Sequence, residues 1–123
     1  MSVLTFGGEP VLRRAPRGQY QLCAPLSVFV GMTLITIPEG FMTDGGTIPP
    51  LCWLLVGHPY SPSSLRAVIL HDWLCKDGRH GWSSTFVHGV LYAALRADGV
   101  AWARARAMWL AAHWFGPTFK AAP

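Results

Sequence analysis

The sequence predicts an α+β fold, in which a small antiparallel β-meander precedes three helices. Two observations support this prediction. The first 40 residues hold short runs of β-branched and aromatic residues that glycine and proline interrupt. From about residue 61 to residue 116, apolar residues instead recur at helical spacing. A run of strands followed by a run of helices is typical of the α+β class.

Three strands are expected in the β-rich part, because turn residues bound each run. The runs are Tyr20–Cys23, Ser27–Val30 and Leu34–Ile37. Gly31 separates the second run from the third, and Pro38–Gly40 closes the last one. Consecutive short strands of this kind indicate an antiparallel meander.

Three helices are expected in the second half: about Pro62–Cys75, Ser84 to near Gly99, and Ala101–Phe115. The first begins where Ser61 can cap the helix and Pro62 occupies its first position. Ser83 or Ser84 caps the second helix. Gly116 and the following proline end the third.

A chain of 123 residues fits one domain, and such a domain buries roughly two-thirds of its unfolded surface. We expect a β-rich part at 1–40, a motif loop at 41–60, a helical part at 61–116 and a short tail at 117–123. The motif loop is expected to be irregular, since its first ten residues are rich in glycine and proline.

The composition points to assembly with partners. Hydrophobic residues make up 51% of the chain and charged residues only 13%, against about 25% in ordinary soluble domains. Six tryptophans are present, and Trp is one of the side chains that anchor buried interfaces. We therefore expect an oligomer or a place in a larger assembly.

The charge pattern argues against two classes of partner. The net charge is +4, but the ten Lys and Arg residues form no run of the kind that binds nucleic acid. The longest uncharged apolar stretch, Leu51–Gly57, is far shorter than the ~20 residues that span a bilayer. The N-terminus lacks the pattern of a secretory signal. These features disfavour a nucleic-acid partner, and we expect no integral membrane segment and no secretory signal.

The three cysteines, Cys23, Cys52 and Cys75, form no C-x-x-C pair and cannot all pair with one another. A disulfide framework is therefore not expected, which favours a reducing compartment. The simplest interpretation makes them small buried side chains. An alternative for Cys75 is a nucleophile, because it follows His71 by one helical turn.

Six carboxylates and five histidines are the acids, bases and metal ligands available, so their positions are informative. Asp44 lies in a Thr-Asp-Gly-Gly segment soon after the last expected strand. The flanking glycines allow a sharp turn that leaves the carboxylate uncrowded. Asp44 could hold a ligand, or it could form an Asx-turn with its own backbone.

His71 and Asp72 lie in an otherwise apolar helical segment, Leu65–Leu74. Neighbours on a helix are about 100° apart, so one of the two can face the motif loop while the other supports it from the side. Burying both is costly unless each is hydrogen-bonded or metal-bound. Two interpretations stay open: a structural pair bonded to the Asp44 loop, or a site for metal or acid–base chemistry.

His88, on the second expected helix, would complete a metal site. Gly89 beside it would let another backbone approach closely. If Asp44, His71 and His88 converge, two imidazoles and one carboxylate suit Zn²⁺ or iron, with positions open for water. Asp72 would then orient His71 or act as a general base.

The other histidines are weaker candidates. His58 and His80 lie among glycine and proline and are expected to be solvated. His113 is expected to be a core or interface residue. It ends a stripe at spacings of i, i+4, i+7 and i+11 that is either core or a docking surface: Trp102, Arg106, Trp109 and His113.

Two motifs give the chain a family resemblance. The loop reads Phe41-Met-Thr-Asp-Gly-Gly-Thr-Ile-Pro49, and the first helix ends in His71-Asp-Trp-Leu-Cys75. From Phe41 to Trp114 the chain resembles a phage and prophage family catalogued as domain of unknown function 1353. Its pattern is Phe-x-Thr-Asp-x-x-Ser-x-Pro and then His-Asp-x-Leu-Tyr, so Thr47 stands for the usual Ser. At His88 the family tends to carry Asp, so a potential metal ligand is kept there.

The resemblance implies a phage gene of the tail or lysis region, without an assigned reaction. We expect a virion-associated protein of the tail or tail tip, made in the host cytoplasm, that contacts other phage structural proteins. It would carry Zn²⁺ or another divalent metal at Asp44, His71 and His88. The alternative is a metal-dependent hydrolase that acts on the bacterial cell envelope, with Asp72 as its catalytic base.

Overall fold

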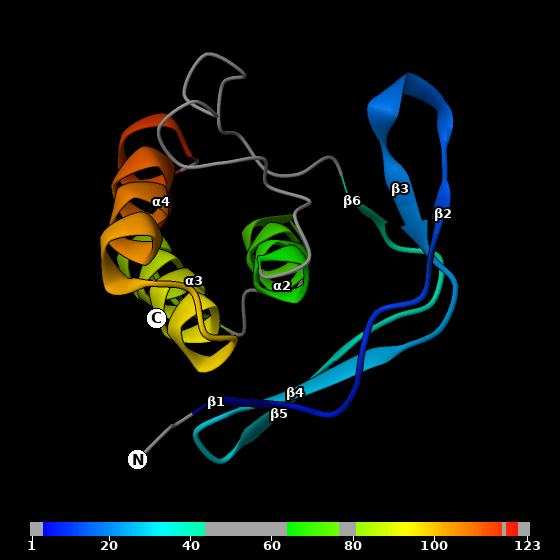
Figure 1. Cartoon of the computed structure of the whole chain (residues 1–123), viewed down its shortest axis with the longest axis horizontal. Coiled ribbons are helices and arrows are strands. Elements are labelled where there is room, and N and C mark those ends of the chain that lie inside the picture. Colours follow the sequence, from blue (N-terminus) through cyan, green and yellow to red (C-terminus); the bar gives the residue numbers. More distant parts are fainter. Residues whose placement is uncertain (1–3, 44–63, 77–80, 117, 121–123) are drawn as a thin grey trace.

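The protein has two three-stranded antiparallel sheets followed by three helices, in a computed structural model that describes residues 4–43, 64–76, 81–116 and 118–120 (Figure 1). This arrangement confirms the predicted α+β class. In Figure 1 the helix α2 (Leu65–Lys76) lies between the strands and the helices α3 (Ser84–Ala97) and α4 (Trp102–Phe115).

The first sheet has the order β1-β4-β5, in which β1 is Leu4–Phe6, β4 is Leu26–Val30 and β5 is Thr33–Ile37. The tight β4–β5 hairpin pairs Val30 with Thr33, and Gly31 adopts a positive φ of 61° in its turn. Such a turn favours glycine because a Cβ atom would be strained there.

The second sheet places β3 (Tyr20–Leu22) between β2 (Leu12–Arg14) and β6 (Met42–Thr43). A short 3-10 turn at Pro16–Gly18 reverses the chain between β2 and β3, with Arg17 at a positive φ of 65°. Both pairings are antiparallel.

The pairing differs from the expected single meander. The three expected strands are present, but β3 belongs to one sheet while β4 and β5 belong to the other. The neighbours of β3 are β2 and β6, and β6 lies in the segment expected to be irregular. Strands of two or three residues are too short for an alternating pattern to reveal them.

The expected ends of the last two helices are confirmed. The Ser83 side chain accepts a hydrogen bond from the backbone N–H of Phe86, which makes Ser83 the N-cap of α3. Gly99, at a positive φ of 83°, follows the end of α3, and Gly116 ends α4. The expected cap of the first helix, Ser61 and Pro62, lies outside the described residues. Within the described part of the chain, no helix is long and apolar enough to cross a membrane.

The core surrounds α2, which is buried on almost every side. It packs against α3, and through its other face it approaches β6. The remaining core residues come from the inward faces of the strands and from α3 and α4, among them Val28, Ile35, Val87, Leu95 and Met108. Because α2 has so little exposed surface, its polar residues His71 and Asp72 are buried with it.

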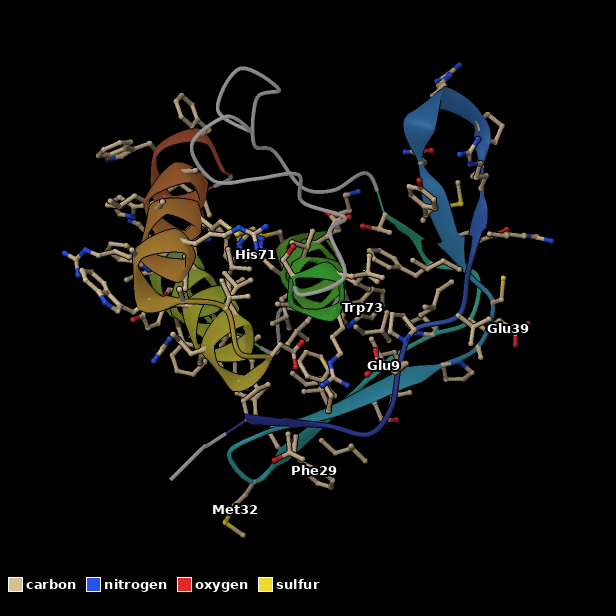
Figure 2. All side chains as sticks on the ribbon, viewed as in Figure 1. Glu9, Phe29, Met32, Glu39, His71 and Trp73 are labelled. Carbon is tan, nitrogen blue, oxygen red and sulfur yellow. The ribbon has the colours of Figure 1, made fainter. Side chains whose placement is uncertain are left out.

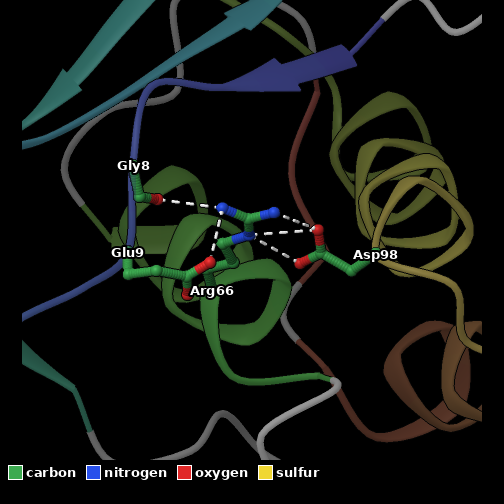
Figure 3. Close-up of polar contacts among 4 residues, drawn as sticks. All are labelled: Gly8, Glu9, Arg66 and Asp98. Atoms are coloured by element: carbon green, nitrogen blue, oxygen red, sulfur yellow. Dashed lines mark hydrogen bonds and ion pairs between the residues drawn. The ribbon is translucent and has the colours of Figure 1, made fainter.

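Arg66, at the start of α2, joins three parts of the fold (Figure 3). Its guanidinium donates to both carboxylate oxygens of Asp98 at 2.7–3.0 Å and to the carbonyl of Gly8 at 2.9 Å. Glu9 adds an ion pair at 3.2 Å, and the guanidinium lies 4.6 Å from the ring centre of Phe6. These contacts fix the strand region and the end of α3 against α2.

Candidate functional site

Three potential metal ligands meet where α2 packs against α3. Nε2 of His71 lies 2.8 Å from Nδ1 of His88, and Sγ of Cys75 lies 3.5 Å from the same Nε2 atom. One ligand atom from each residue lies within 4.8 Å of the other two. All three side chains are buried. We call these three residues the His–Cys–His cluster.

The local sequence explains how the cluster forms. His71 and Cys75 are one turn apart on α2, so both side chains lie on the same face. On α3, His88 is next to Val87 and one turn before Leu91, and both of these apolar side chains are buried. The apolar residues that hold the two helices together thus also hold His88 against His71. Figure 2 shows His71 on the side of α2 that faces the other helices.

Burial controls the protonation of His71. Burial, and to a smaller extent the nearby His88 imidazole, together lower the pKa of this imidazole from 6.5 to about 3. His71 is therefore neutral at pH 7. A neutral imidazole has one nitrogen lone pair, which can accept a hydrogen bond from His88 or bind a metal ion.

The spacing of the cluster is close to that of a tetrahedral zinc site. At typical bond lengths, two nitrogen ligands of Zn²⁺ lie about 3.3 Å apart, and a nitrogen and a sulfur ligand about 3.6 Å apart. The sulfur–nitrogen distance of 3.5 Å matches. The nitrogen–nitrogen distance of 2.8 Å is shorter and is that of a hydrogen bond. A metal ion would replace this hydrogen bond after a shift of about half an ångström.

Asp72 has a charged partner outside the cluster. Its buried carboxylate forms an ion pair with Lys76, one turn later on α2, at 3.3 Å. The Lys76 ammonium lies 5.9 Å from the ring centre of Phe41, directly before β6, so this pair is on the strand side of α2. Among the described residues, the metal-type group contains His71, Cys75 and His88 but not Asp72. The expected roles of Asp72, as orienter of His71 or as general base, stay predictions.

The third ligand predicted from the sequence, Asp44, lies outside the described residues, as do His58 and His80. The residue before it, Thr43, is fully buried at the end of β6, where it pairs with Tyr20. The structure therefore brings together two of the three predicted ligands, His71 and His88. Convergence of Asp44 with them stays a prediction.

A family comparison covers this site. The model of the family described as a protein of unknown function (DUF1353) matches residues 20–112, from β3 to α4. The chain belongs to this family. All three residues of the His–Cys–His cluster lie within the matched segment, and so do both motifs of the resemblance. The expected association with phage particles stays a prediction.

Two relatives of this DUF1353 chain come from Sinorhizobium fredii (strain NBRC 101917 / NGR234). The uncharacterized protein y4iH is 37% identical over 75 residues, and the uncharacterized protein y4jT is 33% identical over 81 residues. The matches span 61% and 66% of this chain but only 30% and 24% of those relatives. No solved structure matches significantly.

Cys75 is the candidate ligand that the sequence interpretation did not select. In the DUF1353 motif of this chain it stands where Tyr is common, and a cysteine in an apolar helix was interpreted as a small buried side chain or a nucleophile. The signal that could have found it is the His-x-x-x-Cys spacing, because positions i and i+4 share a helix face. It became a ligand candidate once His88 was seen to complete the group.

Gly89 does not play the expected role. The sequence suggested that this glycine lets another backbone approach α3, but a Cβ atom there would meet nothing within 4 Å. It borders an apolar groove that Leu4 and Phe86 also line. The close approach occurs instead at Gly116, where a Cβ atom would collide with the carbonyl oxygen of Ala112 and lie 3.3 Å from Cε1 of His88. The C-terminal end of α4 thus covers the His88 ring.

His113 connects this cover to the surface. Its ring centre lies 6.5 Å from that of His88 in an edge-on arrangement, and it stacks on Trp109 at 5.7 Å. The side chain is exposed, so a core position is wrong, and the other expectation, an interface or docking surface, stays a prediction. Trp102 and Arg106, on the same helical stripe, are exposed as well.

Proposed function

We propose that this protein binds a single Zn²⁺ ion through His71, Cys75 and His88. We also propose that it is a metal-stabilised component of a phage particle. The observation that carries the proposal is the approach of the three ligand atoms to one another inside the helical layer. Zinc is the metal named because both imidazole and thiolate ligands suit it.

The role of the metal would be to join α2 to α3. The ligands are buried, with 6%, 8% and 2% of the surfaces of His71, Cys75 and His88 exposed. A buried centre has little contact with bulk water, which favours a structural role. Metal binding would replace one His–His hydrogen bond with three metal–ligand bonds, so the metal would add to the free energy of unfolding.

Membership of a particle is supported by the surface of the first sheet. Three apolar side chains of β4, β5 and their turn are exposed: Phe29, Met32 and Leu34. Met32, at the tip of the hairpin, is fully exposed, and Figure 2 shows it with Phe29 at the outer edge of the molecule. Together with the low share of charged residues, these side chains favour contact with other structural proteins.

Elemental analysis of the purified protein tests the metal. We expect about one zinc per chain, and we expect Cys75→Ala and His88→Gln to lose it. Cys23→Ala is the matched control, because Cys23 is an exposed cysteine outside the cluster. A chelator should lower the Tm of the wild type and of Cys23→Ala but not that of Cys75→Ala. A protein that contains no metal and has the same Tm in chelator would contradict the proposal.

A metal-dependent hydrolase of the cell envelope is the second candidate. It is favoured by the number of protein ligands, because catalytic zinc sites use three and leave the fourth position for water. Release of soluble fragments from bacterial cell walls by the metal-loaded protein tests it. If Asp72→Asn kept the metal and the Tm but abolished the release, the hydrolase would replace the structural role. No release by the metal-loaded wild type would exclude the hydrolase.

A further inference from the structure

The helix α4 is apolar on its outer side as well as on its inner side. Its inner side packs into the core through four residues: Ala105, Met108, Ala111 and Ala112. On the outer side Trp102 is 63% exposed and Trp114 is 68% exposed, and Phe115, at the last position of the helix on the side of Met108, is 50% exposed. A helix that is hydrophobic all round is normally covered on all sides. Figure 1 places α4 at the edge of the molecule, packed against α3.

The charges on this helix have one sign. The charged residues of α4 are Arg104 and Arg106: Arg106 is exposed on the stripe of Trp102, Trp109 and His113, whereas Arg104 lies about 160° around the helix from it. The last carboxylate of the sequence is Asp98, since residues 99–123 contain no Asp or Glu. Asp98 is already bonded to Arg66. The outer face of α4 therefore combines exposed aromatic rings with positive charge and offers no carboxylate.

This pattern argues against a second copy of the chain as the partner. Two such faces would bring Arg106 of each copy together with no carboxylate on α4 to balance them. The outer face of a helix of 14 residues is also small, about 21 Å by 10 Å, or roughly 200 Å². A stable protein interface needs about 800 Å² from each partner.

Nucleic acid fits poorly for a different reason. Specific and non-specific nucleic-acid binding both depend on many phosphate contacts, and a basic groove that follows the backbone is typical. The outer face of α4 is mostly apolar, with Arg106 as its one arginine on the Trp stripe. It lacks the number of cations that such binding requires.

We propose that the outer face of α4 binds to the surface of an anionic lipid membrane. An interfacial helix lies in the plane of the membrane, with aromatic side chains among the headgroups and basic side chains near the lipid phosphates. Trp102 and Trp114 are 12 positions apart, which places them about 18 Å apart along the helix axis. Both ends of α4 would thus be anchored, with Arg106 between them. The protein would bind peripherally, and its metal centre takes no part in the binding.

Vesicles test this proposal. We expect the purified chain to co-sediment with vesicles of phosphatidylcholine mixed with phosphatidylglycerol, with a blue shift of its Trp fluorescence, and to bind pure phosphatidylcholine vesicles about fivefold more weakly, because one arginine near the surface contributes about 1 kcal/mol. The double variant Trp102→Ser, Trp114→Ser should bind the mixed vesicles about tenfold more weakly or worse. Arg106→Gln should weaken binding about fivefold.

Phe29→Ser is the matched control, because Phe29 is an aromatic residue of similar exposure on the opposite part of the fold. It should bind the mixed vesicles like the wild type. Circular dichroism melting checks that each variant is folded. We expect all of them to fold, because the substituted side chains are exposed. Equal binding to neutral and anionic vesicles, or binding that survives the double Trp substitution, overturns the proposal. The proposal is also overturned if the wild type does not bind vesicles but instead binds a single-stranded oligonucleotide or self-associates, and the double Trp variant loses that activity.

Discussion

His71 is a titratable group that α2 and α3 keep almost free of contact with water. Burial first, and then the His88 imidazole, lowers its pKa from 6.5 to about 3. Between these two pH values the unfolded chain therefore binds more protons at this residue than the folded, metal-free protein does. The contribution of His71 to stability is complete above about pH 6.5 and is lost as the pH falls toward 3.

We therefore expect acid sensitivity in the metal-free protein. The free energy of unfolding in chelator should fall as the pH is lowered from about 7.5 to about 5. The total loss by about pH 3 should be at most about 5 kcal/mol. Urea denaturation at a series of pH values measures it. In His71→Gln the slope should be much smaller, whereas the exposed His113→Gln should keep the wild-type slope. An unchanged slope in His71→Gln would assign the acid sensitivity to other groups.

The residues of the site were predictable to different degrees. His71 and His88 could be selected from the sequence because histidines are few and these two interrupt apolar helical stripes. Their contact at 2.8 Å could not be predicted, because helical periodicity shows which face of a helix is buried but not which other helix that face meets. Cys75 was missed because a cysteine fits an apolar stripe as well as Ala or Val does. Its ligand role depends on that same contact between helices.

Among the secondary-structure elements, α3 and α4 were predicted closely and the short strands were not. Ser83 and Gly99 mark the ends of α3 through a side-chain cap and a positive φ, which are local properties of those residues. The strands β1, β2 and β6 are held by pairing with distant partners, such as Leu4 with Val30. Three residues carry too little pattern to reveal pairing of this kind.

Two glycines of the helical layer should respond in opposite ways to alanine. At Gly89, inside α3, an added Cβ atom meets open space, so Gly89→Ala should raise the free energy of unfolding by about 1 kcal/mol through helix propensity. At Gly116 the Cβ atom would collide with the Ala112 carbonyl and press on the His88 ring, so Gly116→Ala should lower it by about 1–3 kcal/mol. Chemical denaturation of both variants measures the pair. If Gly89→Ala instead lowered the free energy of unfolding, the apolar groove beside α3 would have no room for the added Cβ atom.

Across the whole molecule, α2 is the element to which everything else attaches. One side of it meets α3 through the His–Cys–His cluster, and the other side meets the strands through the pair of Asp72 and Lys76 near Phe41. At its start, Arg66 reaches both the end of α3 and the chain around Gly8. Arg66 and Asp98 lie inside the segment matched by the DUF1353 family, whereas Gly8 precedes it. Both partners of this ion pair therefore lie within the segment that the family model matches.

Arg66 and Asp98 should accordingly contribute to stability as one unit. The Asp98 side chain is 8% exposed, so Arg66→Met would leave a carboxylate buried without its partner and should cost about 3 kcal/mol. Arg66→Lys keeps the charge but loses the paired guanidinium bonds, so it should cost less. Denaturation of Arg66→Met, Asp98→Asn and the double variant should give a coupling energy of about 2 kcal/mol.

Glu9→Gln is the control within the same group: its side chain is 81% exposed, and its loss should change stability by less than about 0.5 kcal/mol. Additive effects of the two main substitutions would show that Arg66 acts through Gly8 and Phe6 instead of through Asp98.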